Sequence, residues 1–179
     1  MKIRSLIIVA AALFFAAGLH AQNKVQYHAS ASLSYAMPSW DKAKAGSAEG
    51  LSFGIILKER HYFEGEVIFM KHNWKDGVVG NLTLIPTLAT YRYEISFDAK
   101  SDWYLQLGGS IGTAVQTWKY GLNNKDYIRL AYGAQAMAVY KLNKTFSAIG
   151  GVRILQTEVG EAKQSGNATL FSAGARITF

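Results

Sequence analysis

Residues 25–35 read VQYHASASLSY, and this stretch decides the fold class. Its odd-numbered positions are apolar or aromatic from Val25 to Tyr35, and its even-numbered positions are polar. Successive side chains of a β-strand point to opposite faces, whereas a helical pattern repeats about every 3.6 residues. The stretch therefore predicts a strand with one apolar face and one polar face.

Seven further segments repeat this alternation, and no helical period separates them. Their apolar faces begin near Leu51, Phe63, Ile85, Trp103, Ile128, Phe146 and Phe171. The segment from Ile85 is the least regular, because Leu82, Leu84 and Leu88 blur its phase. Eight strands of this length use the chain that follows the N-terminal segment, so the sequence predicts one all-β domain.

The distribution of charge indicates which face is buried. The charged side chains within the strands fall on the polar faces: Glu64, Glu66, Arg92, Arg129, Arg153 and Arg176. A soluble barrel has an apolar interior, whereas a transmembrane barrel is apolar outside and polar inside. Lipid also excludes open sheet edges. We therefore expect an eight-stranded antiparallel up-and-down transmembrane β-barrel. A soluble lipocalin-like carrier would need the opposite strand phase.

The N-terminal segment has the features of a signal peptide. Lys2 and Arg4 precede an apolar run at 6–17, and a small residue, Ala21, offers a cleavage position. This run is too short to span a membrane as a helix. We expect a signal peptide at 1–21, a barrel at 22–179, and a location in the outer membrane of a Gram-negative bacterium. The chain has no cysteine, so disulfides cannot stabilise it.

The connections are expected to differ between the two ends of the barrel. Long loops are predicted at 37–49, 72–80, 117–126 and 158–167, short links at 58–61 and 141–144, and an intermediate link at 94–101. Aromatic residues near strand ends predict two interfacial girdles. One contains Tyr27, Phe63, Tyr93, Trp103, Tyr140, Phe146 and Phe179, and the outer one contains Tyr35, Phe69, Trp74, Trp118, Tyr127 and Phe171. Trp40, Trp74, Trp118 and Tyr120 lie in or beside the long loops, where aromatics often serve recognition.

The final segment carries a family resemblance. Residues 171–179 end in an aromatic, Phe179, and alternating apolar residues precede it. In this the chain resembles the small outer-membrane β-barrels of the OmpA/OmpX type, in their barrel domain only. The resemblance implies that Phe171, Ile177 and Phe179 form the signal that the barrel-assembly machinery reads. Ala173 and Ala175 are smaller than the residues usual in that pattern.

The lumen of an eight-stranded barrel is just wide enough for side chains to fill it. We expect Glu64, Glu66 and the four inward arginines to form a hydrogen-bonded charge network there, because unpaired buried charges are costly. The alternative is a gated polar path, which would make the protein a narrow porin-like channel.

The preferred function is non-enzymatic: a structural or surface-interaction barrel that acts through its outer loops. His28 and Ser30 share one strand face and suggest an alternative, a lipid-modifying hydrolase similar to lipid A deacylases, with Glu64 or Glu66 orienting the histidine.

Partners are expected to be outer-membrane lipid or lipopolysaccharide, the assembly machinery and an extracellular ligand at the loops, with the protein a monomer. His61 and His72 lack a second ligand at metal spacing, so we expect no metal and no cofactor. Scattered basic residues predict no nucleic-acid binding.

Overall fold

The computed structural model describes residues 25–40, 42–75, 79–98, 101–121, 123–159 and 164–179. The predicted signal peptide at 1–21 lies outside these residues. No helix in the described parts of the chain is long and apolar enough to cross a membrane.

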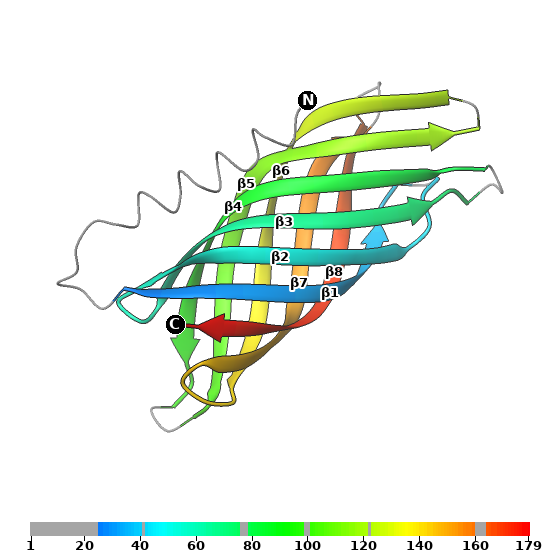
Figure 1. Cartoon of the computed structure of the whole chain (residues 1–179). Helices are drawn as coiled ribbons and strands as arrows, with labels where there is room; N and C mark the ends of the chain where they lie inside the picture. The colour runs from blue at the N-terminus through cyan, green and yellow to red at the C-terminus, as the bar shows by residue number, and fades with distance from the viewer. Residues whose placement is uncertain (1–24, 41, 76–78, 99–100, 122, 160–163) are drawn as a thin grey trace.

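Eight antiparallel strands, each paired with its neighbours in sequence, close into one barrel (Figure 1). They are β1 (Gln26–Pro38), β2 (Gly46–Leu57), β3 (His61–Asn73), β4 (Asn81–Ser96), β5 (Trp103–Tyr120), β6 (Asn123–Lys141), β7 (Phe146–Val159) and β8 (Gln164–Thr178). Pairing of β1 with β8 completes the closure. The predicted eight-stranded up-and-down barrel is confirmed.

The two faces of the sheet have the polarity that the alternation predicts. Ala31 pairs with Leu51 on one side and with Ala175 on the other, so the apolar positions of adjacent strands share the outer face. Leu33, Leu51 and Ile111 are 69%, 67% and 59% exposed, and large apolar side chains on the other strands face outward beside them. Water would penalise this belt, whereas lipid solvates it. The outer surface is that of a transmembrane barrel.

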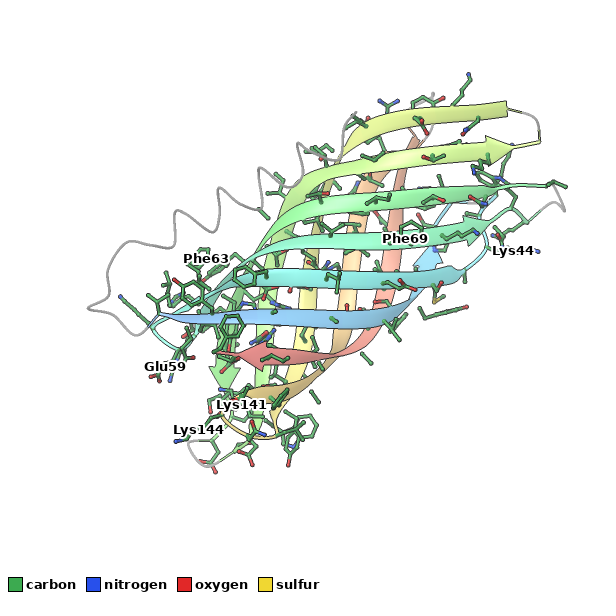
Figure 2. The ribbon with its side chains drawn as sticks, in the orientation of Figure 1. Lys44, Glu59, Phe63, Phe69, Lys141 and Lys144 are labelled. Atoms are coloured by element: carbon green, nitrogen blue, oxygen red, sulfur yellow. The ribbon has the colours of Figure 1, made fainter. Side chains whose placement is uncertain are left out.

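The two ends of the barrel have unlike connections. At the turn end, where the chain also reaches Phe179, the links span 58–60, 97–102 and 142–145. The opposite end, here the loop end, carries the connections at 39–45, 74–80, 121–122 and 160–163. Figure 2 shows Lys44 at the loop end and Glu59, Lys141 and Lys144 at the turn end.

The prediction of long loops at 117–126 and 158–167 is wrong, because strand pairing continues through most of these residues. Thr117 pairs with Asp126 and Tyr120 with Asn123, so the β5–β6 hairpin turns only at 121–122. Glu158 pairs with Ser165 in the same way. Beyond the lipid both sheet faces meet water, so these polar residues carry no alternation, although cross-strand pairing still satisfies their backbone groups.

The first tight turn uses an unusual backbone conformation. Lys58 and Glu59 have φ angles of 50° and 63°, and the Arg60 amide donates to the Leu57 carbonyl at 3.2 Å. Positive φ at both central residues is the mirror-image turn whose twist matches a two-stranded hairpin. Neither residue is the glycine or asparagine that this turn favours, so the geometry of the turn could not be predicted from residue types alone.

An aromatic cluster covers the junction between the first and last strands. The amide of Tyr27 donates to the carbonyl of Phe179 at 2.8 Å, and the amide of Phe179 donates to the carbonyl of Tyr27 at 2.9 Å. Ring centroids lie 6.3 Å apart for Tyr27 and Phe179, and 6.3 Å apart for Phe53 and Phe179. The last residue therefore takes part in barrel closure through both its backbone and its ring.

The outer aromatic girdle differs from the prediction at three positions. Tyr127 pairs with the fully buried Gln116 and therefore shares the inner face. Tyr35, Phe69 and Phe171 are exposed on the outer face near the loop end. Trp74, by contrast, is 5% exposed, and Trp118 pairs with the fully buried Leu82 on the inner face. Both indole rings point inward, 5.1 Å apart between ring centroids, so they belong to the interior rather than to the lipid boundary.

Candidate functional site

The lumen is the candidate site, because alternation sends one side chain in two from every strand into it. Glu64 of β3 lies near the centre of a group of charges. Its carboxylate binds the Arg92 guanidinium on β4, and its Oε1 lies 4.0 Å from Nη2 of Arg176 on β8. The Nε2 atom of His28 on β1 lies 3.4 Å from the same oxygen. Three strands besides β3 thus converge on one buried carboxylate.

Glu66 anchors a second branch of the same group, nearer the loop end. Its Oε2 lies 2.7 Å from Nη2 of Arg153 and accepts a 3.3 Å hydrogen bond from Thr90 Oγ1. Arg153 also donates from Nε to the Gln135 amide oxygen at 3.1 Å. The predicted lumen residues Glu64, Arg92 and Arg176 therefore form one group, and Glu66 and Arg153 form a second ion pair that lines the same cavity as Glu64 and Arg92.

Glu94 extends the network toward the turn end, although it is not among the predicted lumen residues. Its Oε2 accepts hydrogen bonds from Tyr62 at 2.6 Å and from Gln106 at 2.7 Å, while Oε1 lies 3.0 Å from Lys141 Nζ. Gln106 in turn accepts from Arg176 at 3.0 Å. The alternation could have indicated this role, because Glu94 lies on the same strand and the same face as Arg92. We assigned residues 94–101 to a link, whereas β4 continues to Ser96.

Charge balance explains how these groups tolerate burial. Three carboxylates, on Glu64, Glu66 and Glu94, lie among Arg92, Arg153, Arg176 and the half-exposed Lys141. A buried ion is costly unless an opposite charge and hydrogen bonds replace its hydration. Here each carboxylate contacts a cation, and each arginine contacts a carboxylate.

Arg129 does not join this network. Its inward-facing position follows from its pairing with the fully buried Ala114, but it lies toward the loop end and is half-buried. Its guanidinium carbon lies 5.1 Å from the ring centroid of Tyr127, and its Nη1 donates to the Ile128 carbonyl at 3.4 Å. Alternation predicts the face of a strand residue but not its depth along the barrel axis.

The histidine and serine that suggested a hydrolase are held by other partners. The Ser30 hydroxyl lies 2.6 Å from that of Ser52, in a hydrogen bond between the two serines. His28 is fully buried, with its ring edge against Tyr62 at a centroid distance of 5.5 Å. Its nearest carboxylate, Glu64, is already bound to Arg92. Both residues face the lumen rather than the lipid.

A small cavity lies between these serines and the charge network. Ser30, Ser32 and Ser52 line one side of it, and Glu66 and Arg153 line the other. The cavity volume, measured as the space open to the centres of water molecules, is about 30 Å³. A single water needs roughly 10–15 Å³ on this measure, so the space suits about two waters.

A cluster of apolar side chains lies inside the barrel between this cavity and the loop end. It consists of Ala36, Ala48, Ile68, Met70, Trp74, Leu82, Leu84, Leu88, Ala114, Ala131, Leu155, Ala168 and Leu170, with Trp40 and Trp118 packed against it. We call this set the apolar layer. It explains the irregular phase of β4, because Leu82, Leu84 and Leu88 are at most 2% exposed and point inward.

Tryptophans cover the loop-end side of the apolar layer. Trp74 donates from Nε1 to the Lys119 carbonyl at 2.7 Å, which ties β3 to the β5–β6 hairpin. Trp40 lies edge-on to His72, with ring centroids 5.8 Å apart, and its indole occupies the space above Gly166 where a β-carbon would stand. Trp74 is buried, and Trp40 and Trp118 are partly buried against the apolar layer. A recognition role for these three residues stays a prediction.

The described residues contain no group of three or more histidine, aspartate or glutamate side chains that could hold a metal ion. His61 lies at the turn end beside Tyr91, with its Nδ1 3.0 Å from the tyrosine hydroxyl. His72 lies inside the loop end, with its Nδ1 3.0 Å from the Lys44 carbonyl. The two histidines therefore lie at opposite ends of β3.

The sequence matches no family model and no curated protein. Solved structures do match. Neisserial surface protein A is 18% identical, with a TM-score of 0.65, over 87% of this chain and 97% of its own. The N-terminal β-barrel domain of Pseudomonas aeruginosa OprF is 14% identical, with a TM-score of 0.57, over 88% and 100%.

Ail, the attachment invasion locus protein of Yersinia pestis, is 9% identical, with a TM-score of 0.60, over 86% of this chain and 98% of its own. At these identities the likeness shows the fold. The chain has the fold of the small eight-stranded outer-membrane β-barrels, the class that the sequence resemblance indicated.

Proposed function

We propose that this protein is a non-enzymatic outer-membrane β-barrel with a closed lumen, which acts as a rigid scaffold and presents its loop end to the outside of the cell. One observation carries the proposal. Two groups of side chains, the ion-pair network and the apolar layer, lie one after the other along the lumen. An ion that exchanged places with the charged side chains would still meet a mainly apolar stretch, in which His72, Gln116 and Thr157 are buried polar side chains, and its desolvation there is costly.

The outer-membrane location is supported by the exposed apolar belt and by the class of the matching folds. The β5–β6 hairpin, in which both strands extend at the loop end, supports an interaction role. Ail is described as an attachment protein, and the present chain shares its fold. The proposal includes a monomeric barrel, inserted by the barrel-assembly machinery and surrounded by lipopolysaccharide.

A hydrolase is the less favoured function. Acyl transfer needs a nucleophile bonded to a base and reachable by its substrate. Ser30 bonds to another serine, and His28 is enclosed by the network. Comparison of lipid A by mass spectrometry, with and without the gene, tests this directly. A lost acyl chain that depends on His28 would overturn the non-enzymatic proposal.

Location and orientation can be tested together, because the natural chain has no cysteine. Val79 at the loop end is 82% exposed, and Leu142 at the turn end is 62% exposed. Val79→Cys and Leu142→Cys are each expressed and treated, on intact cells, with a membrane-impermeant maleimide. We expect rapid labelling of Val79→Cys and labelling of Leu142→Cys only after lysis. The reverse pattern, or recovery of either variant as a soluble periplasmic protein, would contradict the proposal.

A further inference from the structure

We propose that the loop end carries a built site for the phosphate groups of the outer-leaflet glycolipid. The site consists of Lys42, Lys44, Lys71 and Lys75, and we call this set the lysine rim. The inference rests on the proposed outer-membrane location and adds a lipid partner and the residues that bind it.

A short β-ribbon holds the lysine rim in place. Ala43 forms an antiparallel bridge with Trp74. The Lys44 amide donates to the Asn73 carbonyl at 2.8 Å, and the Lys75 amide donates to the Lys42 carbonyl, also at 2.8 Å. The connection between β1 and β2 is therefore tied to the end of β3, so these lysines belong to a paired segment.

Alternation along this ribbon turns the lysines outward. Ala43 and Trp74 are 1% and 5% exposed and lie against the barrel interior, so their neighbours in sequence take the opposite face. All four lysines are exposed. Trp74 fixes the ribbon by its hydrogen bond to the Lys119 carbonyl, and His72 Nδ1 lies 3.0 Å from the Lys44 carbonyl. Buried aromatic anchors thus position a basic outer surface.

The arrangement of charge favours an anion at this surface. Lys42 lies opposite Lys75 across the ribbon, and like charges in that position are destabilising by themselves. None of the four ammonium groups forms an ion pair with a described carboxylate. Asp41 and Asp76 adjoin the rim in the sequence and lie outside the described residues, so the four lysines of the rim exceed these two carboxylates by two positive charges.

Beyond the rim the charges on the outer face are mixed, because the exposed Asp126, the strand partner of Thr117, accompanies the exposed Lys119. Lys71 pairs with Thr83, and Thr83 pairs with Thr117, two residues before the exposed Lys119. Glu49 is the described carboxylate on the outer face of β2. It lies two residues after Ser47, the strand partner of Lys71. At the turn end the exposed charges are mixed in sign, with Lys58 and Arg60 on either side of Glu59.

The height of the rim on the barrel selects a lipid headgroup as the occupant. Phe69, 46% exposed, lies on the same outer face only two residues before Lys71. Tyr35 and Met37, 56% and 48% exposed, carry the apolar belt to the same end of β1. The lysines therefore begin where the belt stops, at the boundary of hydrocarbon and headgroups. Basic side chains at this level bind anionic lipid at about 1 kcal/mol each.

The test uses the full-length mature chain, refolded in zwitterionic detergent micelles and checked by heat-modifiable gel migration. Native mass spectrometry measures retention of diphosphorylated lipid A, of its dephosphorylated form, and of a soluble sulfated oligosaccharide. The rim variant combines Lys42→Gln, Lys44→Gln, Lys71→Gln and Lys75→Gln. The matched turn-end variant combines Lys58→Gln, Arg60→Gln and Lys144→Gln.

We expect the rim variant to weaken diphosphorylated lipid A binding by at least about tenfold, and the turn-end variant to change it less than about twofold. The dephosphorylated lipid should bind weakly to every form. Glu49→Gln should strengthen binding by about twofold, because it removes a carboxylate near Lys71.

Three results would overturn the inference: unchanged lipid A affinity in the rim variant, an equal loss in the turn-end variant, or rim-dependent binding of the sulfated oligosaccharide without binding of lipid A. Surface labelling of Val79→Cys separates the two proposals. If that labelling fails, the outer-membrane function itself is wrong. If labelling succeeds and lipid binding is independent of the rim, only the lipid site is wrong.

Discussion

Glu64 is the residue on which side chains from several strands converge inside the barrel. Its carboxylate contacts Arg92 and Arg176 and approaches His28, so groups from β1, β4 and β8 meet on a residue of β3. Each contact closes part of the lumen cross-section. The same carboxylate neutralises arginines whose charge the protein interior could not otherwise accommodate.

Removal of the two central carboxylates should therefore destabilise the barrel. We predict that Glu64→Gln with Glu66→Gln lowers the free energy of unfolding by about 3–5 kcal/mol, because Arg92, Arg153 and Arg176 lose their ion-pair partners. The measurement is the temperature at which the folded gel band disappears in detergent. Glu49→Gln, an exposed site on the outer face, is the control and should leave that temperature nearly unchanged. An unaltered temperature in the double variant would contradict the network.

Sequence predicted the chemistry of this network better than its extent. Glu64 and Arg92 can be recognised in the sequence because they are charged residues on the polar face of strands whose other face is apolar. Lys141 and Tyr62 could not be assigned, because their roles depend on a common depth in the barrel that register alone sets. Arg129 illustrates the same limit in reverse, since it has the correct face but a different height. The apolar layer was missed because its leucines disturbed the expected polarity of the inner face.

The individual strands were predictable where lipid lies on one side of them. A period of two arises only when the two faces meet different surroundings, as they do between lipid and lumen. The same strands continue at the loop end, where Lys119 pairs with Asn124 on β6. There the polarity signal ends although the pairing does not. The predicted loops were too long for this physical reason.

The last strand allows a sharper test at the level of the element. Phe179 pairs with Tyr27 through its backbone and stacks against Tyr27 and Phe53. We predict that Phe179→Ala lowers stability by about 1 kcal/mol through lost ring contacts and also reduces the amount of barrel assembled in cells. Phe179→Tyr should restore both.

The control for this test is Phe97→Ala, which changes a 70% exposed phenylalanine in a turn-end link. Stability is measured on protein refolded in detergent, and assembly is measured on isolated outer membranes. A loss of assembly with unchanged stability would assign Phe179 to recognition by the assembly machinery alone. Normal values for both would contradict a role in closure and in assembly.

At the scale of the whole molecule, the barrel combines a lipid-facing belt with two groups of side chains inside it, an ion-pair network and an apolar layer. The ion pairs stiffen the turn-end half, and the apolar layer separates them from the loop end. The tryptophans pack over that layer and, through Trp74, hold the β1–β2 and β5–β6 connections together. The proposed scaffold role follows from this closure, because a rigid interior positions the outward surfaces that meet lipid and ligands.

Single-channel recording from the refolded mature protein in planar lipid bilayers tests that closure most directly. A bacterial porin inserted into the same bilayers confirms sensitivity, and heat-modifiable migration confirms that the protein is folded. A barrel lacking part of the apolar layer, with Leu82→Ala, Leu84→Ala and Leu155→Ala, serves as the widened comparison. The two-layer lumen predicts no discrete conductance steps from the natural sequence. Reproducible steps from that sequence, as large as those of the widened variant, would contradict it.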